Sequence, residues 1–271
     1  QARISGYDGQ DTLGGYDGSD VLIGGKGNDT LYGSQGSDAY EWSRGDGNDE
    51  LRDTSTEVLY SDRLILVDVS STDAATDVSL PRASGSTNVV LEITTGANTE
   101  TITLIEQTVG APGGKGIEEI HFSDGVVWSL KDIEKNTHIK GGSGNQTLDG
   151  ENDNQTDVFF GEAGNDRLYD ASSNSGNSHF YGGEGNDTLY GYDGNDTYYW
   201  AHGDGNDYIR DTNPTGDELN TLVLTDVLPG EVELGRFGTN PDMRVRINDG
   251  STTTDLWIES QYHSSCLGDG L

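Results

Sequence analysis

Residues 6–41 read GYDGQDTLG, GYDGSDVLI, GGKGNDTLY and GSQGSDAYE, which are four consecutive segments of nine residues. Each segment opens with a glycine-rich stretch, continues to an aspartate and places a large apolar residue two positions later. Glycine clusters indicate turns, and an apolar residue between polar neighbours indicates a strand. Each segment is therefore predicted to form one turn and one short strand. The repeated residues are Asp11, Asp20, Asp29 and Asp38, followed by Leu13, Leu22, Leu31 and Tyr40.

The repeat returns after residue 140 in a less regular form. In the first copy of this second run, Gln146 replaces the aspartate. In a later, degenerate turn, Ser178 replaces it. Both runs close on a stretched turn, WSRGDGNDELRD at 42–53 and WAHGDGNDYIRD at 200–211. The clearest copies are GEAGNDRLY, GGEGNDTLY and GYDGNDTYY, which start at Gly161, Gly182 and Gly191.

A longer repeat is superimposed on the nonapeptides. Residues 33–69 align without a gap with residues 191–227, at a constant offset of 158 residues. The first unit continues through residues 116–133, whereas the second stops at Leu271. We therefore expect two tandem units, the second of them cut off, in a fragment of a longer protein.

The segments between the nonapeptide runs have a different pattern. Apolar residues alternate in RLILV at 63–67, VVLEI at 89–93 and TITL at 101–104, and Gly, Asn and Ser punctuate these runs. Such short, β-branched runs predict antiparallel strands.

Composition narrows the possible partners. The chain has 271 residues, including 40 glycines, and its 48 Asp and Glu against 15 Lys and Arg give a net charge of −33. Nucleic acid and anionic membrane surfaces are poor partners for such a chain, because phosphate binding needs clustered Lys and Arg. No stretch approaches the ~18 apolar residues of a transmembrane helix. The single Cys266 excludes an internal disulfide and a Cys-based zinc site, so calcium is expected to stabilise the fold in their place.

The pattern GGxGxDxUx, with U a large apolar residue, resembles the nonapeptide of the repeats-in-toxin (RTX) family, and GGKGNDTLY and GGEGNDTLY match it almost completely. The resemblance implies an all-β fold of two parallel β-rolls, each followed by an antiparallel β-rich capping segment as in the adenylate cyclase toxin and the haemolysins. The expected domains are a first β-roll at 1–53, a capping segment at 54–139, a second β-roll at 140–211 and a truncated second capping segment at 212–271.

The resemblance also implies where calcium binds. One coil of a β-roll takes two nonapeptides, so successive turns on one side are 18 residues apart in the regular run. An ion then lies between two such turns, each of which supplies two alternate carbonyls and its aspartate. Calcium takes six to eight oxygen ligands, which suits this mixture. The ligands carried over to the first roll are Tyr7, Gly9 and Asp11 with Gly24, Lys26 and Asp29; Tyr16, Gly18 and Asp20 with Gly33, Gln35 and Asp38; and Gly25, Gly27 and Asp29 with Arg44, Asp46 and Asp49.

The second roll is expected to hold fewer ions per turn. Sites through Gln146 and Ser178 lack a carboxylate, which weakens any pairing of Ser178 with Asp196, itself a candidate ligand. The remaining candidates in this roll are Glu162, Gly164 and Asp166 with Gly182, Glu184 and Asp187, and Gly183, Gly185 and Asp187 with His202, Asp204 and Asp207.

The energetics of the repeat predict folding on calcium binding. One buried Leu or Tyr per repeat contributes about 1.5–3 kcal/mol, whereas backbone ordering costs roughly 1–2 kcal/mol per residue over nine residues. Stacked carboxylates repel in addition. The rolls are therefore expected to be disordered without Ca²⁺ and to fold at the calcium concentrations found outside cells.

No catalytic signature accompanies the repeats: HExxH, GxSxG and the phosphate-binding GxxxxGK[ST] are absent from the sequence, so we expect no enzyme. The expected function is that of a calcium-binding structural module in a large secreted RTX protein, a toxin such as a haemolysin or an adhesin, exported by type I secretion to the extracellular space or cell surface. Two alternatives stay open: an adhesive module whose β-rich flank binds a glycan or host-cell receptor, and the non-catalytic tail of an RTX enzyme. Trp42 and Trp200 are interpreted as aromatic plugs that close the rolls.

Overall fold

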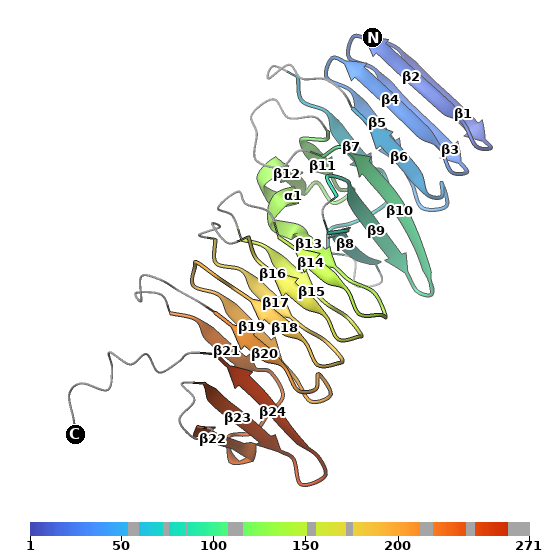
Figure 1. Ribbon diagram of the computed structural model, residues 1–271. Coiled ribbons are helices and arrows are strands. Elements are labelled where there is room, and N and C mark those ends of the chain that lie inside the picture. Colours follow the sequence, from blue (N-terminus) through green and yellow to red (C-terminus); the bar gives the residue numbers. More distant parts are fainter. Residues whose placement is uncertain are drawn as a thin grey trace. The chain divides into compact units, whose positions relative to one another are not determined.

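The computed structural model describes residues 1–53, 60–72, 76–84, 86–107, 116–150, 156–171, 176–211, 219–236 and 242–259. The chain forms two compact units, residues 1–82 with 86–137 and residues 83–85 with 138–271, and each contains one parallel β-roll (Figure 1). In the described ranges, no helix has the length and apolar character needed to span a membrane. Cys266, the expected boundaries at 54 and 212 and the expected truncation at Leu271 lie outside these ranges.

The coils of the first unit alternate between two parallel sheets. Arg3 pairs with Val21 and Thr12 pairs with Thr30, a step of 18 residues on each sheet. One coil therefore takes two nonapeptides, as the sequence predicts. One sheet contains β1 (Arg3–Asp8), β3 (Val21–Lys26), β5 (Ala39–Trp42), β7 (Arg63–Leu66) and β11 (Glu119–His121), and the facing sheet contains β2 (Thr12–Asp17), β4 (Thr30–Gln35) and β6 (Asp49–Arg52).

The expectation that residues 63–67 form an antiparallel strand was wrong. These residues form β7, which pairs in parallel with β5 and so continues the roll. Leu64 and Leu66 are fully buried and lie in register with Tyr40 and Trp42. The strand joins the roll because it repeats the inward-facing apolar alternation of the coils, although a longer connection precedes it.

Antiparallel strands follow the coils of the first unit. β10 (Asn98–Ile105) pairs in parallel with β6, and β9 (Val89–Thr95) and β8 (Thr76–Arg82) then continue the sheet in antiparallel order. β12 (Val127–Ser129) pairs in antiparallel order with β11. The predicted strands at 89–93 and 101–104 are therefore present, and their role as caps stays a prediction.

A short helix, α1 (Leu130–Asn136), was not expected in this flank. Its start has a capping signal, because the amide of Ser129 donates a 2.9 Å hydrogen bond to Oδ2 of Asp132, three residues later. Ile133 is fully buried and holds the helix against the unit's core. The signal is present in the sequence, but the helix is shorter than the windows that reveal helical periodicity.

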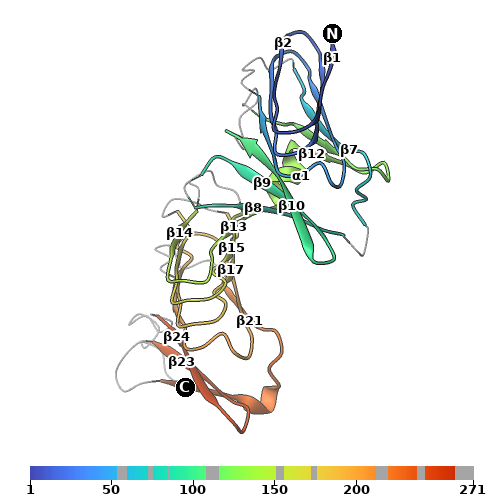
Figure 2. The ribbon, with the colours of Figure 1, turned by 90° about the vertical axis from the view of Figure 1, so that its right-hand side faces the viewer.

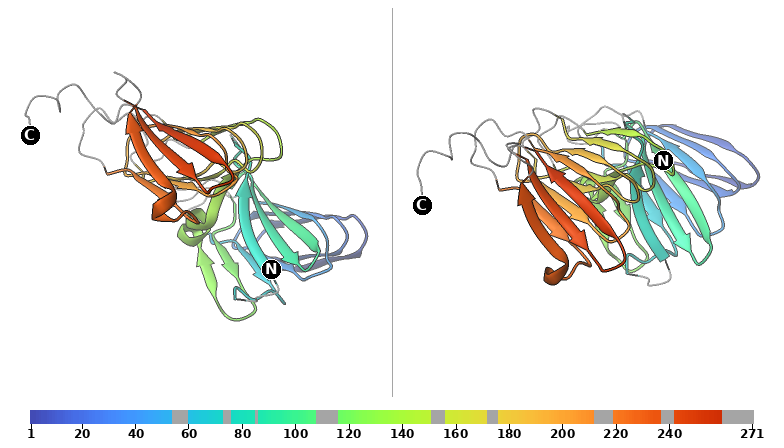
Figure 3. Two further views of the ribbon diagram at one scale, coloured as in Figure 1. Left: turned by 90° about the horizontal axis from the view of Figure 1, so that it is seen from below. Right: turned by 60° about the horizontal axis from the view of Figure 1, so that its bottom comes forward.

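The second unit repeats this plan. Its first parallel sheet contains β13 (Thr137–Lys140), β15 (Val158–Phe160), β17 (His179–Tyr181), β19 (Thr197–Trp200) and β21 (Thr221–Leu224). The facing sheet contains β14 (Thr147–Asp149), β16 (Arg167–Tyr169), β18 (Thr188–Tyr190) and β20 (Tyr208–Arg210), and the coils that join the two sheets are visible in Figure 2. β24 (Thr253–Ile258) pairs in parallel with β20, and β23 (Met243–Asn248) and β22 (Val232–Arg236), preceded by the 3-10 helix η1 (Pro229–Glu231), follow in antiparallel order (Figure 3).

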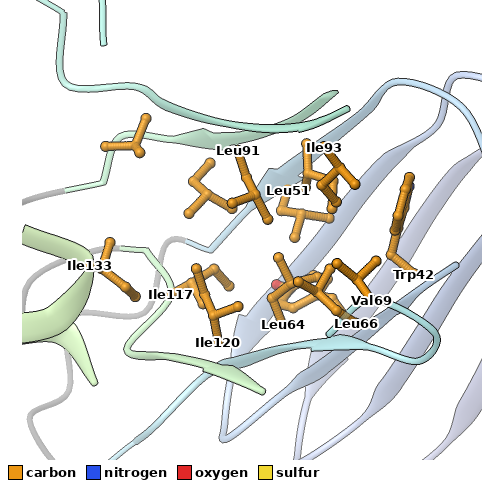
Figure 4. Packing of buried hydrophobic residues seen from close by; sticks show 14 of the residues in the cluster. Trp42, Leu51, Leu64, Leu66, Val69, Leu91, Ile93, Ile117, Ile120 and Ile133 are labelled. Carbon is orange, nitrogen blue, oxygen red and sulfur yellow. The ribbon is translucent and has the colours of Figure 1, made fainter. Parts of the chain in front are cut away.

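The cores are columns of apolar side chains between facing sheets. In the first unit, Leu51, Leu91 and Ile93 face Leu64 and Leu66 (Figure 4). In the second unit, the Phe180 ring stacks on Phe159 with centroids 4.9 Å apart and on Tyr198 at 5.1 Å. Each nonapeptide thus contributes one side chain to a continuous column. Trp42 and Trp200 are both 2% exposed and belong to these cores.

Candidate metal centre

Most turns of both rolls share one backbone conformation, from which the turn at 141–146 departs. Their second and fourth positions have positive φ, as at Tyr7 (70°) and Gly9 (133°), or Gly25 (92°) and Gly27 (139°). The fourth position is occupied by glycine because φ near 140° is accessible to almost no other residue. The second position also accepts other residues in the left-handed region, which sequence reasoning missed. These residues are Tyr7, Tyr16, Ser34, Glu162 and Tyr192.

The first glycine of each turn is required for a different reason. A Cβ on Gly182 would lie 2.5 Å from Oδ2 of Asp187, and one on Gly15 would lie 3.0 Å from Oδ2 of Asp20. The missing side chain therefore leaves space beside the carboxylate of the same turn. This space forms a cradle next to an anionic oxygen.

Two successive turns on one side of a roll, here called a turn pair, direct their carbonyls at each other. In the pair formed by residues 6–11 and 24–29, a Cβ on the second or fourth residue of the later turn would collide with the carbonyl oxygen of Tyr7 or Gly9. The oxygen of Gly24 points back, because it lies 2.7 Å from the Cβ position of the first glycine in the earlier turn. Oxygens that face the later turn in the same way are those of Gly18, Gly27, Gly144, Glu162, Gly164, Gly176 and Gly185, and those of Gly33 and Gly182 point back.

One backbone hydrogen bond recurs in every predicted turn pair. The amide of Gly9 donates to the carbonyl of Lys26 over 2.7 Å, and that of Gly18 donates to Gln35 over 2.7 Å. The stretched turns keep this bond despite their extra residues. There the carbonyl of Asp46 accepts it from Gly27 over 2.7 Å and that of Asp204 from Gly185 over 2.8 Å. In the regular turn at 182–187, the carbonyl of Glu184 accepts it from Gly164 over 2.8 Å.

The aspartates form ladders along the rolls. The amide of Asp11 donates a 2.8 Å hydrogen bond to Oδ1 of Asp29, and Asp20 donates to Asp38 over 2.7 Å. In the second roll, Asp166 donates to Asp187 and Asp187 to Asp207, both over 2.8 Å. The pairing of aspartates expected from the 18-residue step is present in the first roll.

The ladder hydrogen bonds use only one of the two carboxylate oxygens of an aspartate. Among the residues that the structure describes, several turn aspartates have a buried Oδ2 without a hydrogen-bond partner. A buried anionic oxygen is costly unless a donor or cation satisfies it. The residues concerned are Asp11, Asp20, Asp29, Asp38, Asp166 and Asp187.

These features fit a hard divalent cation. Carbonyl and carboxylate oxygens of two turns face one another, and calcium takes six to eight oxygens in flexible geometry. Calcium in these turns would neutralise the stacked carboxylates and join each coil to the next. The predicted ligands are brought together in turn pairs, and which of their oxygens bind an ion stays a prediction.

Two predicted carbonyl ligands lie at the start of the stretched turns. The amide of Arg44 donates to Oδ1 of Asp68 over 3.0 Å, and that of His202 donates to Oδ1 of Asp226 over 2.9 Å. These bonds tie both turns to the connection after the next strand. The two extra residues of each turn are thereby accommodated without loss of the aspartate ladder.

The positions without a carboxylate keep the ladder but not its charge. Gln146 donates its amide to Oδ1 of Asp166 over 2.7 Å, while its own Oε1 accepts from the amide of Gly142. Ser178 donates its amide to Oδ1 of Asp196 over 2.8 Å, and its hydroxyl donates to Asp170. Turn pairs through these residues have one carboxylate fewer, so the expected weaker calcium binding there stays a prediction.

Burial raises the pKa of several ladder carboxylates. The pKa of Asp187 is raised to about 6, that of Asp49 to about 7 and that of Asp207 to about 8. Desolvation is the main cause, and neighbouring carboxylates add to it, while the amide from the preceding coil opposes it. These groups therefore bind either a proton or a cation readily.

Sequence reasoning missed two members of the ladders. The amide of Asp38 donates to Oδ1 of Asp62 over 2.6 Å, and that of Asp62 donates to Oε2 of Glu118 over 2.7 Å. The signal was present, because Asp62 and Glu118 each stand two positions before a buried apolar residue, Leu64 or Ile120. Insertions before both residues hide that spacing from a search for a nine-residue period.

Asparagines that precede the turn aspartates form a second ladder. The side-chain oxygen of Asn145 accepts from the amide of Asn165 over 2.8 Å, and the same contact links Asn165 to Asn186 and Asn186 to Asn206. The repeated GND in the sequence was its signal. These side chains hold the coils in register without carrying charge.

Comparison with known proteins identifies the repeats. The sequence has no match among curated proteins. The crystal structure of the extracellular lipase LipA from Serratia marcescens is similar at 18% identity and a TM-score of 0.38, over 94% of this chain and 38% of the lipase chain. The family model of the RTX calcium-binding nonapeptide repeat matches residues 5–40, 135–168 and 172–199, with four copies. Both rolls therefore contain RTX calcium-binding nonapeptide repeats.

Proposed function

We propose that this chain is a calcium-dependent folding module of a secreted RTX protein. The observation that carries the proposal is the series of buried turn aspartates whose Oδ2 atoms have no hydrogen-bond partner among the described residues. A metal ion between coils would satisfy these atoms and neutralise their charge. In this proposal calcium acts as a structural element and takes part in no reaction.

The balance of forces favours folding only when the ions bind. The chain carries a net charge of −33, and its ladders place carboxylates on successive coils, where like charges destabilise the compact state. Binding to the folded form alone stabilises it by mass action, so the binding energy of calcium becomes folding energy. The module is then disordered at low calcium and ordered at high calcium.

This dependence suits export from a cell. Extracellular calcium modules have dissociation constants of about 10⁻⁴–10⁻³ M, which leaves them nearly empty at cytosolic calcium and well filled outside. The chain would pass the export machinery unfolded and fold after it. We propose that the module is non-catalytic and serves a longer parent chain, whose activity lies elsewhere.

Circular dichroism during a calcium titration, with EGTA as the reference, tests the proposal. Expected is a transition from disorder to β structure that shifts to higher calcium in the double variant Asp11→Asn and Asp20→Asn. A matched control is Asp8→Asn with Asp17→Asn, which removes the same charge from exposed positions of the same turns. A chain that keeps its full β signal in EGTA would contradict the proposal.

A further inference from the structure

Three buried carboxylates meet at the end of the first nonapeptide run. Asp38, Asp53 and Asp62 are each at most 2% exposed, and one carboxylate oxygen from each lies within 4.8 Å of the others. Asp38 precedes β5, Asp53 follows β6 and Asp62 precedes β7. The cluster therefore lies where the regular coils pass into the flank of the first unit.

Asp53 occupies the place of a turn glycine. Gly15, Gly33 and then Asp53 stand at the same position of successive coils, as the register of β2, β4 and β6 shows. A Cβ on Gly33 would lie 2.6 Å from Oδ2 of Asp38 and would collide with Oδ2 of Asp53 and the hydroxyl of Tyr40. The cradle beside Asp38 thus receives a further carboxylate from the next coil.

The hydrogen bonds leave one oxygen of this cluster without a partner. Oδ1 of Asp38 accepts from the amide of Asp20, and Oδ1 of Asp62 accepts from the amide of Asp38. Oδ2 of Asp53 accepts from the hydroxyl of Tyr40 over 2.9 Å. Oδ2 of Asp38, a residue with no exposed surface, has no partner among the described residues, and it lies 2.6 Å from the Cβ position of Gly33, which Oδ2 of Asp53 also approaches.

We infer that Asp38, Asp53 and Asp62 form a three-carboxylate calcium site that closes the first roll and binds calcium more tightly than the turn pairs. Oxygen donors alone select a hard cation, and affinity rises with the number of charged ligands. The inference rests on the proposed function, because it adds a distinct terminal site to the calcium ladder. The ion would tie the coils to the flank, since Asp62 also accepts from the amides of Glu118 and Glu119 through its carbonyl.

The second unit contains a natural comparison. At the offset of 158 residues, Asp196, Asp211 and Asn220 replace the three aspartates, and the hydroxyl of Tyr198 donates to Asp211 over 2.8 Å as Tyr40 does to Asp53. Asn220 still accepts from the amide of Asp196. It is exposed and carries no charge, so this unit has one carboxylate fewer at the same place.

A shared proton is the competing explanation of the cluster. Burial, followed by the charges of Asp53 and its neighbours, raises the pKa of Asp62 to about 8, so a proton could relieve the repulsion in place of a cation. The two explanations differ in one respect. A proton-sharing cluster gains stability when Asp62 becomes neutral, whereas a calcium site loses an ion.

The test compares Asp62→Asn with Asn220→Asp in the full chain. Bound calcium is counted by equilibrium dialysis with atomic emission, and titration calorimetry gives the affinity of the tightest class of sites. Expected for Asp62→Asn is one ion fewer per chain and a calcium midpoint for folding that is roughly tenfold higher. Asn220→Asp should add one tight site, and this gain keeps the test decisive if Asp62→Asn fails to fold.

The outcomes separate this inference from the proposed function. If Asp62→Asn binds as many ions as the wild type and folds at the same or a lower calcium concentration, the terminal site is refuted and the ladder is not. If Asn220→Asp adds no ion, the rule that a third carboxylate creates a tight site fails. If the wild-type chain binds no calcium at all, the proposed function fails with it.

Discussion

The amide of Asp29 donates a 2.9 Å hydrogen bond to Oδ1 of Asp49, twenty residues later, although the turn between them has two extra residues. The bond matches that between Asp11 and Asp29, which are eighteen residues apart. The extra residues bulge outward at Ser43, where Asp46 closes a local turn by accepting from its amide. The aspartate ladder, and not the loop length, is therefore what the coils preserve.

Asp29→Asn separates the two tasks of a ladder carboxylate. Asparagine keeps an oxygen for the amide of Asp11 but removes the charge that would bind calcium. We expect the calcium midpoint of folding to rise, by roughly tenfold, with the full β signal kept at saturating calcium. Circular dichroism titrations measure both, and Asp17→Asn, at an exposed position, serves as the control. A reduced β signal at saturating calcium with an unchanged midpoint would show that Asp29 contributes only the hydrogen bond.

Gly27→Ala tests the turn conformation. Gly27 has a φ of 139°, and an added Cβ would collide with the carbonyl oxygen of Gly9. We expect a loss of at least about 1–3 kcal/mol in the free energy of unfolding at saturating calcium, from backbone strain alone. Urea denaturation measures it. Gly230→Ala is the matched control, because a Cβ there meets no atom within 4 Å, and equal effects of the two changes would contradict the argument.

The regular coils could be predicted because their information is local. A turn and an inward-facing residue recur at fixed spacing, and the resemblance to RTX repeats implies that one parallel coil takes two of them, so the pairing of Asp11 with Asp29 could be predicted. The same holds for the second unit wherever GND recurs. The spacing determines which residues of successive coils stack on each other, and each stacked pair of aspartates then forms the same hydrogen bond.

The end of the first roll could not be predicted because its contacts are distant in sequence. Asp62 lies 24 residues after Asp38, and Glu118 lies 56 residues after Asp62, so no fixed period links them. Asp53 looks like the last residue of a repeat, and only the stacking of β6 on β4 places it where Gly33 stands in the coil before. Tertiary pairing decided these positions.

The pH dependence of the metal-free chain follows from the ladder carboxylates. Burial raises the pKa of Asp49 to about 7 and that of Asp207 to about 8 in the folded state, above the ~3.9 of an exposed Asp. The folded state therefore binds more protons than the unfolded state, and this contribution is full below about pH 4 and lost as the pH rises through 7 to 8. In EGTA, acidification from pH 8.5 to 5.5 should increase β structure by circular dichroism. An unchanged signal, or a decrease, would contradict this sign.

Phe180→Ala tests whether the apolar column limits the stability of the folded second roll. Phe180 has no exposed surface and stacks between Phe159 and Tyr198, so alanine leaves a cavity within the column. A loss of about 3–5 kcal/mol in the free energy of unfolding is expected in saturating calcium. Tyr181→Ala, which removes a neighbouring ring from the outer face of the same strand, should lower the free energy of unfolding clearly less. Since the proposed calcium sites lie in the turns and not in the column, excess calcium should recover part of the loss by mass action in both variants. Equal costs at the two positions, measured by urea denaturation, would show that the outer ring stack contributes as much as the core.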